Sequence, residues 1–294
     1  MSIFKGSGVA LITPFNENGE IDYKVLKKLI DFQIQNQTDS IIICGTTGEA
    51  STLSIVERLK CIEECVKYVN KRIPVIAGTG SYCTKTAIEL SKASQEIGAD
   101  GLLCVSPYYN KTSQEGLKQY YNRISDSVNI PIIMYNVPSR TGINIEAKTA
   151  IEICMQNENI VAIKECSGKI DQISEILASN TLEVYSGNDD QIVPILSLGG
   201  SGVISVVANI FPKQVHDMVS NYLNGNIAFS RKMQLDMLKL NKALFSDVNP
   251  IPIKKATEIL GMSSGVLREP LIKLDKNKTK TLKMEIQNFN NMYK

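Results

Sequence analysis

The order of short β-branched runs and longer amphipathic stretches constrains the fold of this chain more than any other feature. Eight runs of four or five residues read as strands, and helical patterns lie between them. The expected strands are Val9–Ile12, Ser40–Ile43, Pro74–Ala77, Gly101–Val105, Pro131–Met134, Ile160–Lys164, Leu182–Tyr185 and Gly202–Val206. The expected helices among them include Tyr23–Gln35, Ser54–Val69, Thr84–Ile97 and Ser113–Val128.

Strands with hardly a polar residue indicate a parallel sheet that is covered on both faces by helices. Eight βα units over about 210 residues favour a closed (β/α)8 TIM barrel. A doubly wound sheet is the alternative, but it usually carries a glycine fingerprint after its first strand. Here Thr13-Pro14-Phe15-Asn16 follows instead. We therefore predict an α/β TIM barrel.

The strand signal stops after residue 225. The stretches Ile227–Phe245, Pro252–Leu260 and Lys278–Met292 read as helices, and prolines punctuate the segment between the first two. The sequence therefore predicts a (β/α)8 catalytic barrel over residues 1–225 and a helical C-terminal extension over residues 226–294.

Charge and composition exclude several classes of function. The chain has 32 basic and 30 acidic residues, a net charge of +2. It therefore lacks the excess of positive charge that is typical of nucleic-acid-binding proteins. No apolar stretch has the length of a membrane span, and Met1–Gly6 lacks the features of a signal peptide, so a cytoplasmic location is expected. Seven cysteines, an odd number, read as reduced thiols. His216 is the only histidine and is expected on the surface of a helix, so no multi-histidine metal centre is possible and no metal is expected.

Lys164 closes the apolar run that begins at Ile160. Burial disfavours the ammonium form and lowers the pKa of a lysine. A neutral amine is a nucleophile, and such lysines form Schiff bases with carbonyl substrates. A Schiff base stores electrons as an enamine, which suits the making or breaking of a carbon–carbon bond next to a carbonyl.

Polar residues collect where the expected strands end, which in a TIM barrel is the face that carries the active site. Besides Lys164 they supply phenols, hydroxyls and one guanidinium. The stretches are Gly45-Thr46-Thr47-Gly48-Glu49, Ser106-Pro107-Tyr108-Tyr109-Asn110, Tyr135 to Gly142 with Arg140, and Gly187-Asn188-Asp189-Asp190, and the eighth strand contains Ile204. Phenols bridged by a hydroxyl can relay protons without histidine.

Each of these features has an ordinary structural alternative. The Lys164 amine can reach past the strand end into water. The turn Gly45–Gly48 can be capped by its own threonines, and Asp189-Asp190 resembles a pair at a helix N-terminus. Tyr135 can be a strand aromatic, and Arg140 can bind a backbone carbonyl. Function is favoured because all of them fall at the same end of the predicted barrel.

Three motifs carry a resemblance to a known family. Gly45-Thr46-Thr47-Gly48-Glu49, the stretch from Tyr135 to Gly142, and Ile163-Lys164-Glu165 resemble the motifs of the dihydrodipicolinate synthase family, within the class I pyruvate-dependent aldolases. The likeness runs from about residue 5 to Pro250-Ile251-Pro252-Ile253-Lys254. It implies condensation of pyruvate with L-aspartate 4-semialdehyde on the way to diaminopimelate and lysine, without a cofactor, by a homo-oligomer that is commonly a tetramer.

The resemblance also implies roles for the catalytic residues. Lys164 would form the Schiff base with pyruvate. Tyr135 would donate and accept protons, and Thr46 would link it to Tyr109. In the family this second tyrosine comes from a neighbouring subunit.

Four further residues resemble substrate-binding positions of the family. Thr47 and the Ile204 backbone match positions that hold the pyruvate carboxylate. Arg140 matches the arginine that receives the carboxylate of the semialdehyde, a task suited to a planar bidentate donor. Gly187 would line the pocket.

The chain departs from the family where many members bind lysine as a feedback inhibitor. Ile55, Arg58, Tyr82 and Thr86 stand where a lysine-sensitive bacterial enzyme would have His, His, Asn and Glu. Arg58 would repel the ammonium of the ligand, and Thr86 does not replace the lost negative charge. We therefore expect weak or absent feedback by L-lysine.

Two other functions stay open at this point. One is another pyruvate aldolase, such as N-acetylneuraminate lyase or a keto-sugar-acid aldolase, although Arg140 suits a short aldehyde that carries a carboxylate better than a hydroxylated sugar. The other is a barrel that only binds a small acid, which need not keep Lys164, Tyr135 and Tyr109 together.

Overall fold

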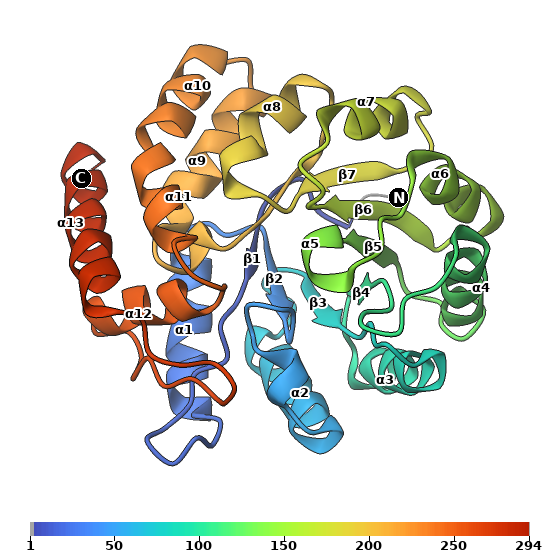
Figure 1. Cartoon of the computed structure of the whole chain (residues 1–294), viewed down its shortest axis with the longest axis horizontal. Coiled ribbons are helices and arrows are strands. Elements are labelled where there is room, and N and C mark those ends of the chain that lie inside the picture. The colour runs from blue at the N-terminus through green and yellow to red at the C-terminus, as the bar shows by residue number, and fades with distance from the viewer. Residues whose placement is uncertain (1–2, 294) are drawn as a thin grey trace.

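The computed structural model describes residues 3–293 and contains a closed barrel of eight parallel strands, which pair in chain order before β8 returns to β1 (Figure 1). The prediction of a TIM barrel is confirmed. The strands are β1 (Gly6–Ala10), β2 (Ser40–Ile43), β3 (Val75–Gly78), β4 (Gly101–Val105), β5 (Ile132–Asn136), β6 (Ile160–Glu165), β7 (Glu183–Ser186) and β8 (Gly202–Ser205).

The structure corrects the boundaries of two strands that matter for the site. β1 begins at Gly6 instead of Val9, because its first residues pair with β8 even though Gly6-Ser7-Gly8 carries no β-branched signal. β5 runs to Asn136, so Tyr135 lies inside a strand and not in the loop that follows it. Tyr135 thereby takes a fixed position in the ladder opposite β4 and β6.

Two glycines allow β1 and β8 to pair, and this pairing closes the barrel. Gly202 opens β8 with φ +151°, and a Cβ atom there would stand 1.9 Å from the Gly6 carbonyl oxygen. Gly6 itself has φ +131°. Only glycine allows this backbone conformation and this close approach of two strands.

The strands bury both of their faces. Side chains that include Ala10, Ile42, Ile133 and Ile204 fill the barrel interior in one apolar cluster. Their neighbours along the strands, such as Ile41 and Ile163, pack outward in a second and larger cluster against the helices. This alternation explains why strands such as β2 and β4 read as almost continuous apolar runs.

Two of the surrounding helices begin at residues whose side chains cap them. The Asp22 carboxylate accepts hydrogen bonds from two backbone N–H groups of α1, and Ser54 and Glu57 form a capping box at the start of α2. The helices of the barrel are α1 (Tyr23–Gln35), α2 (Ile55–Val69), α3 (Thr84–Ile97), α4 (Gln114–Ser125), α5 (Pro138–Thr141), α6 (Ala147–Gln156), α7 (Ile170–Ala178), α8 (Ile192–Ser197) and α9 (Pro212–Leu223).

Helices α10 (Ile227–Asp236), α11 (Leu238–Leu244), α12 (Ile251–Ile259) and α13 (Lys276–Met292) follow and lie beside α1 and α9 (Figure 1). The prediction of one helix over Ile227–Phe245 is wrong. The stretch divides at Met237 because its two parts pack on different neighbours, α10 on α8 and α9, and α11 on α12 and α13. The division of the chain at residue 225 stays a prediction. Within residues 3–293, no helix is both long and apolar enough to cross a membrane.

The cysteines are free thiols, four of them buried, as the sequence predicts. His216 lies on α9 as expected, but it is half-buried and not on the open surface. Its Nδ1 atom lies 2.9 Å from a carboxylate oxygen of Asp39. Met1 and Ser2 of the expected non-signal N-terminus lie outside the described residues.

Candidate active site

Lys164 and Tyr135 lie side by side because their strands are neighbours in the barrel. The register of β5 and β6 pairs the two residues directly, and the Lys164 amine lies 4.5 Å from the centre of the Tyr135 ring. Only 5% of Lys164 and 6% of Tyr135 are exposed. The alternative of an amine reaching into water is therefore wrong.

Burial also sets the acid–base character of this pair. Loss of hydration lowers the pKa of Lys164, and the positive charge of Arg140 lowers it further, while Cys166 and Asp189 act in the opposite direction. Burial raises the pKa of the Tyr135 phenol, although hydrogen bonding to Thr46 favours its ionised form. The site thus contains an amine that loses its proton more readily than usual beside a phenol that retains its own.

Gly187 makes room for Lys164. A Cβ atom at this position would lie 2.8 Å from Lys164 Cε and 2.0 Å from Cys166 Sγ. The end of β7 therefore passes close to the lysine stem and can carry no side chain without displacing it.

Asp189 is the acidic residue near the lysine. Its carboxylate is buried and accepts hydrogen bonds from the Ser205 hydroxyl and from the backbone N–H groups of Val206 (2.9 Å) and Val207 (3.3 Å). Asp189 thus fixes the chain after β8, whereas its expected role was at the start of its own helix. Burial raises the pKa of the carboxyl group, and these hydrogen bonds oppose the shift.

The loop after β2 carries the two threonines. Cys44 precedes it in a left-handed conformation with φ 56°, and Glu49 ends it with φ 53°. Thr47 is buried, and its hydroxyl accepts a hydrogen bond from Asn249 Nδ2 at 3.0 Å. Left-handed non-glycine residues are uncommon and cluster at functional sites.

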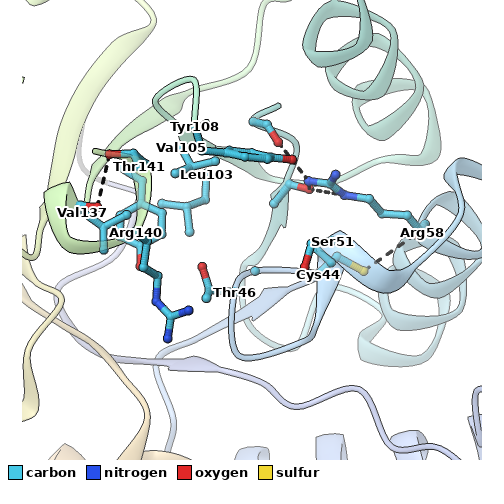
Figure 2. Close-up of a pocket in the computed structure, with 15 residues that line it drawn as sticks. Cys44, Thr46, Ser51, Arg58, Leu103, Val105, Tyr108, Val137, Arg140 and Thr141 are labelled. Carbon is cyan, nitrogen blue, oxygen red and sulfur yellow. Dashed lines mark hydrogen bonds between the residues drawn. The ribbon is translucent and has the colours of Figure 1, made fainter. Parts of the chain in front are cut away.

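A cavity of about 190 Å³ adjoins the pair on the side of Tyr135. Figure 2 shows Thr46 and Arg140 toward one end and Arg58 at the other. Arg140 projects from α5 and donates a hydrogen bond to the Asn249 carbonyl oxygen at 2.8 Å. Lys164 and Thr47 do not line this cavity, whereas Tyr135 both lines it and contacts the Lys164 amine.

Arg58 closes the far end of the cavity. Its guanidinium donates hydrogen bonds to the carbonyl oxygens of Gly78 (3.0 and 2.6 Å) and Gly80 (3.4 Å), drawn as dashed lines in Figure 2. Burial lowers the pKa of Arg58. Ile55 and Tyr82, which belong to the same expected feedback region, are exposed.

Two of the predicted residues stand apart from this cavity. Tyr109 is 94% exposed in a left-handed conformation with φ 72°, and it does not line the cavity of its own chain. Ile204 is fully buried inside the barrel. The structure therefore brings Lys164, Tyr135, Thr46, Arg140 and Gly187 into one region and leaves Tyr109 facing outward.

Sequence reasoning missed Asn249 and Cys166. Asn249 contacts both Thr47 and Arg140, although it lies 202 residues after the first and 109 residues after the second. Its only local signal is the proline that follows it. Cys166 reaches the site because it lies two residues after Lys164 and so points to the same side of the chain. Among residues 3–293, no group of three or more His, Cys, Asp or Glu side chains is placed to hold a metal ion.

The chain is similar to known proteins over almost its full length. Residues 3–289 match the model of the Dihydrodipicolinate synthetase family. A 4-hydroxy-tetrahydrodipicolinate synthase of Clostridium tetani is 54% identical over 290 residues, which are 98% of each chain. The crystal structure of dihydrodipicolinate synthase from Aquifex aeolicus superposes with a TM-score of 0.96 at 43% identity and covers 98% of both chains. A chloride-inhibited dihydrodipicolinate synthase from Acinetobacter baumannii, solved with pyruvate, gives 0.95 at 40% identity, with 97% of this chain and 99% of that chain covered.

Proposed function

The chain belongs to the dihydrodipicolinate synthetase family, and from that premise we propose how its site carries out the reaction. The activity is that of a 4-hydroxy-tetrahydrodipicolinate synthase, a lyase of the class I aldolase type that condenses pyruvate with L-aspartate 4-semialdehyde. The names of the relatives favour this activity over N-acetylneuraminate or keto-sugar-acid cleavage. The observation that carries the mechanism is the buried Lys164 amine beside Tyr135.

The first half of the reaction activates pyruvate. The Lys164 amine adds to the C2 carbonyl, water leaves, and an iminium ion joins the lysine to the substrate. Loss of a proton from C3 then gives an enamine. Tyr135 would move these protons, with Thr46 as its hydroxyl partner. Thr47 and the backbone at Ile204 would hold the pyruvate carboxylate, while Gly187 leaves the space that the modified lysine needs.

The second half forms the carbon–carbon bond. The enamine C3 attacks the aldehyde carbon of the semialdehyde, whose oxygen takes a proton from Tyr135. The amino group of the condensed product then attacks C2 and displaces the Lys164 amine, which closes the ring and frees the enzyme. Arg140 would receive the carboxylate of the semialdehyde, and its contact with the Asn249 carbonyl oxygen fixes the guanidinium beside the cavity that Arg140 lines.

Tyr109 completes this proposal only in an oligomer. Tyr109 is exposed, and so is Tyr82, whose carbonyl oxygen accepts a hydrogen bond from the neighbouring Asn110. We infer that a second copy of the chain covers this exposed pair of tyrosines and receives Tyr109 next to its own Thr46. We also propose that the protein assembles into a tetramer and that it is located in the cytoplasm.

Activity with competing substrates tests the proposed function. The purified chain with pyruvate should convert L-aspartate 4-semialdehyde in a coupled assay, and the Lys164→Ala variant should not. N-acetylneuraminate supplied alone should not yield pyruvate. Preferential cleavage of N-acetylneuraminate would contradict the assignment.

Mixing two inactive variants tests the role of Tyr109. A hybrid dimer of Lys164→Ala and Tyr109→Phe chains contains one site with both residues intact if Tyr109 acts on the neighbouring copy. Random exchange should then restore about a quarter of the sites. No recovery, in a mixture shown to exchange subunits, would contradict the shared site.

A further inference from the structure

A buried ion pair joins the threonine loop to the C-terminal part of the chain. The Lys254 amine contacts Glu49 Oε1, and the two side chains are 1% and 0% exposed. The amine also donates a hydrogen bond to the Val266 carbonyl oxygen at 2.8 Å and lies 3.9 Å from the centre of the Phe15 ring. Two charges are rarely taken so far from water, because the cost of desolvation is met only by close and complete pairing.

Glu49 needs such an anchor because of its backbone. It holds the left-handed conformation that ends the loop, and its N–H donates to the Thr46 carbonyl oxygen at 3.0 Å. The second oxygen of the Glu49 carboxylate accepts the Arg268 backbone N–H at 3.1 Å. A strained residue persists only where its surroundings over-determine it. Both oxygens of this carboxylate are held by the C-terminal part of the chain.

The same C-terminal segment holds the loop at a second point. Asn249 lies five residues before Lys254 and donates to the Thr47 hydroxyl, while its carbonyl oxygen accepts from Arg140. Asn249 thus reaches the loop near its middle, and Lys254 reaches its end.

We propose that Glu49 and Lys254 are positioning residues, whose ion pair holds the Gly45–Glu49 loop in the conformation that presents Thr46 and Thr47 to pyruvate. This inference rests on the proposed function and assigns the C-terminal part of the chain a task in it. Neither side chain is placed to touch the substrate, since both are enclosed between the loop, Phe15 and the chain around Val266.

Three variants test the proposal: Lys254→Met, Glu49→Gln, and the double variant. Each single variant leaves one buried charge without its partner, so both should lower the midpoint of thermal unfolding and kcat/KM for pyruvate. The double variant leaves no unpaired charge and should recover most of the unfolding midpoint. Its kcat/KM for pyruvate should nevertheless stay at least about tenfold below that of the unaltered enzyme, because the loop has lost its anchor.

Lys255→Met is the matched control. Lys255 is the next residue on α12 and forms an exposed pair with Glu258 at 2.8 Å, so the same substitution there should change neither the unfolding midpoint nor the rate. Borohydride should still trap pyruvate on all variants at saturating concentration, because Lys164 is unaltered. The KM for the semialdehyde should change less than the KM for pyruvate, since Asn249 still holds Arg140.

A double variant that recovers both the unfolding midpoint and the full rate would reduce the ion pair to a structural role and overturn the proposal. If the double variant does not fold, kcat/KM for pyruvate is measured on Glu49→Gln instead. The temperature is one at which the circular dichroism of this variant equals that of the unaltered enzyme. Unchanged kcat/KM for pyruvate under those conditions overturns the proposal equally. If the unaltered enzyme and Lys255→Met both fail to make product, the proposed function fails instead.

Discussion

The close approach of β7 to the lysine stem makes Gly187→Ala the most informative single substitution in the site. The added methyl carbon would stand 2.0 Å from Cys166 Sγ and 2.8 Å from Lys164 Cε. Ordinary contact between non-bonded heavy atoms begins near 3.5 Å, so the sulfur must retreat by roughly 1.5 Å and the lysine carbon by roughly 0.7 Å. Both side chains are held by the same strand, β6, and its immediate continuation.

These displacements set the expected magnitudes. Overpacking of a filled site typically costs about 1–3 kcal/mol of stability. A displacement of about 1 Å at the reacting centre can cost about 100-fold in rate, so a shift of this size in Lys164 should lower kcat/KM for pyruvate by between about 10- and 100-fold. Binding of the semialdehyde should be affected less, because the atoms nearest to the added methyl group belong to Cys166 and Lys164 and not to Arg140.

Steady-state kinetics and urea unfolding of four proteins measure this effect: the unaltered enzyme, Gly187→Ala, Cys166→Ala, and the double variant. Removing the Cys166 sulfur relieves the shorter contact and leaves the one to Lys164, so the double variant should regain much of the lost stability but only part of the rate. A Gly187→Ala enzyme whose kcat/KM for pyruvate stays within twofold of the unaltered value would refute the reasoning.

Four further outcomes are expected. Arg140→Ala should raise the KM for the semialdehyde at least tenfold and leave borohydride trapping of pyruvate unchanged; equal effects on both substrates would contradict its assigned role. Tyr135→Phe should lower kcat by about 10²–10⁴-fold, the usual contribution of a proton-transfer group, and a loss below tenfold would remove it from the proton relay. The hydrogen bond to Asp39 raises the pKa of His216, so the stability it contributes is present below the unfolded-state value of 6.5 and is lost as pH rises through the higher folded-state pKa. Urea unfolding should therefore show His216→Gln losing less stability than the unaltered protein between pH 6 and pH 9, and parallel losses would contradict this. L-lysine below 1 mM should leave the steady-state rate unchanged because Arg58 occupies the cavity end; inhibition in that range would show this to be wrong.

The sequence predicts those parts of this molecule that depend on local pattern. Hydrophobic period and helix capping are local properties, so the sequence predicts several elements to the residue. These are the strands Ser40–Ile43 and Gly101–Val105 and the helices Tyr23–Gln35 and Thr84–Ile97. Lys164 is recognisable in the same way, as a lysine at the end of an apolar run. The distance of its amine from Tyr135 could not be predicted, since it depends on the register of two strands.

Contacts between segments that lie far apart in the sequence cannot be predicted from local sequence patterns. Asn249 reaches Thr47 across about 200 positions, and Lys254 pairs with Glu49 over a similar separation. In sequence, Lys254 looks like one more lysine on an amphipathic helix, and nothing in its neighbours indicates that it is buried. The orientation of Tyr109 is likewise set by how the folded loop meets its surroundings and not by residues near it in the chain.

Mass spectrometry after borohydride reduction in the presence of pyruvate tests the central claim most directly. The peptide that contains Lys164 should carry one reduced pyruvate adduct, and Lys164→Ala should carry none while its fold is retained. An unmodified Lys164 at saturating pyruvate, or an adduct of the same yield in the Lys164→Ala variant, would contradict the Schiff-base mechanism.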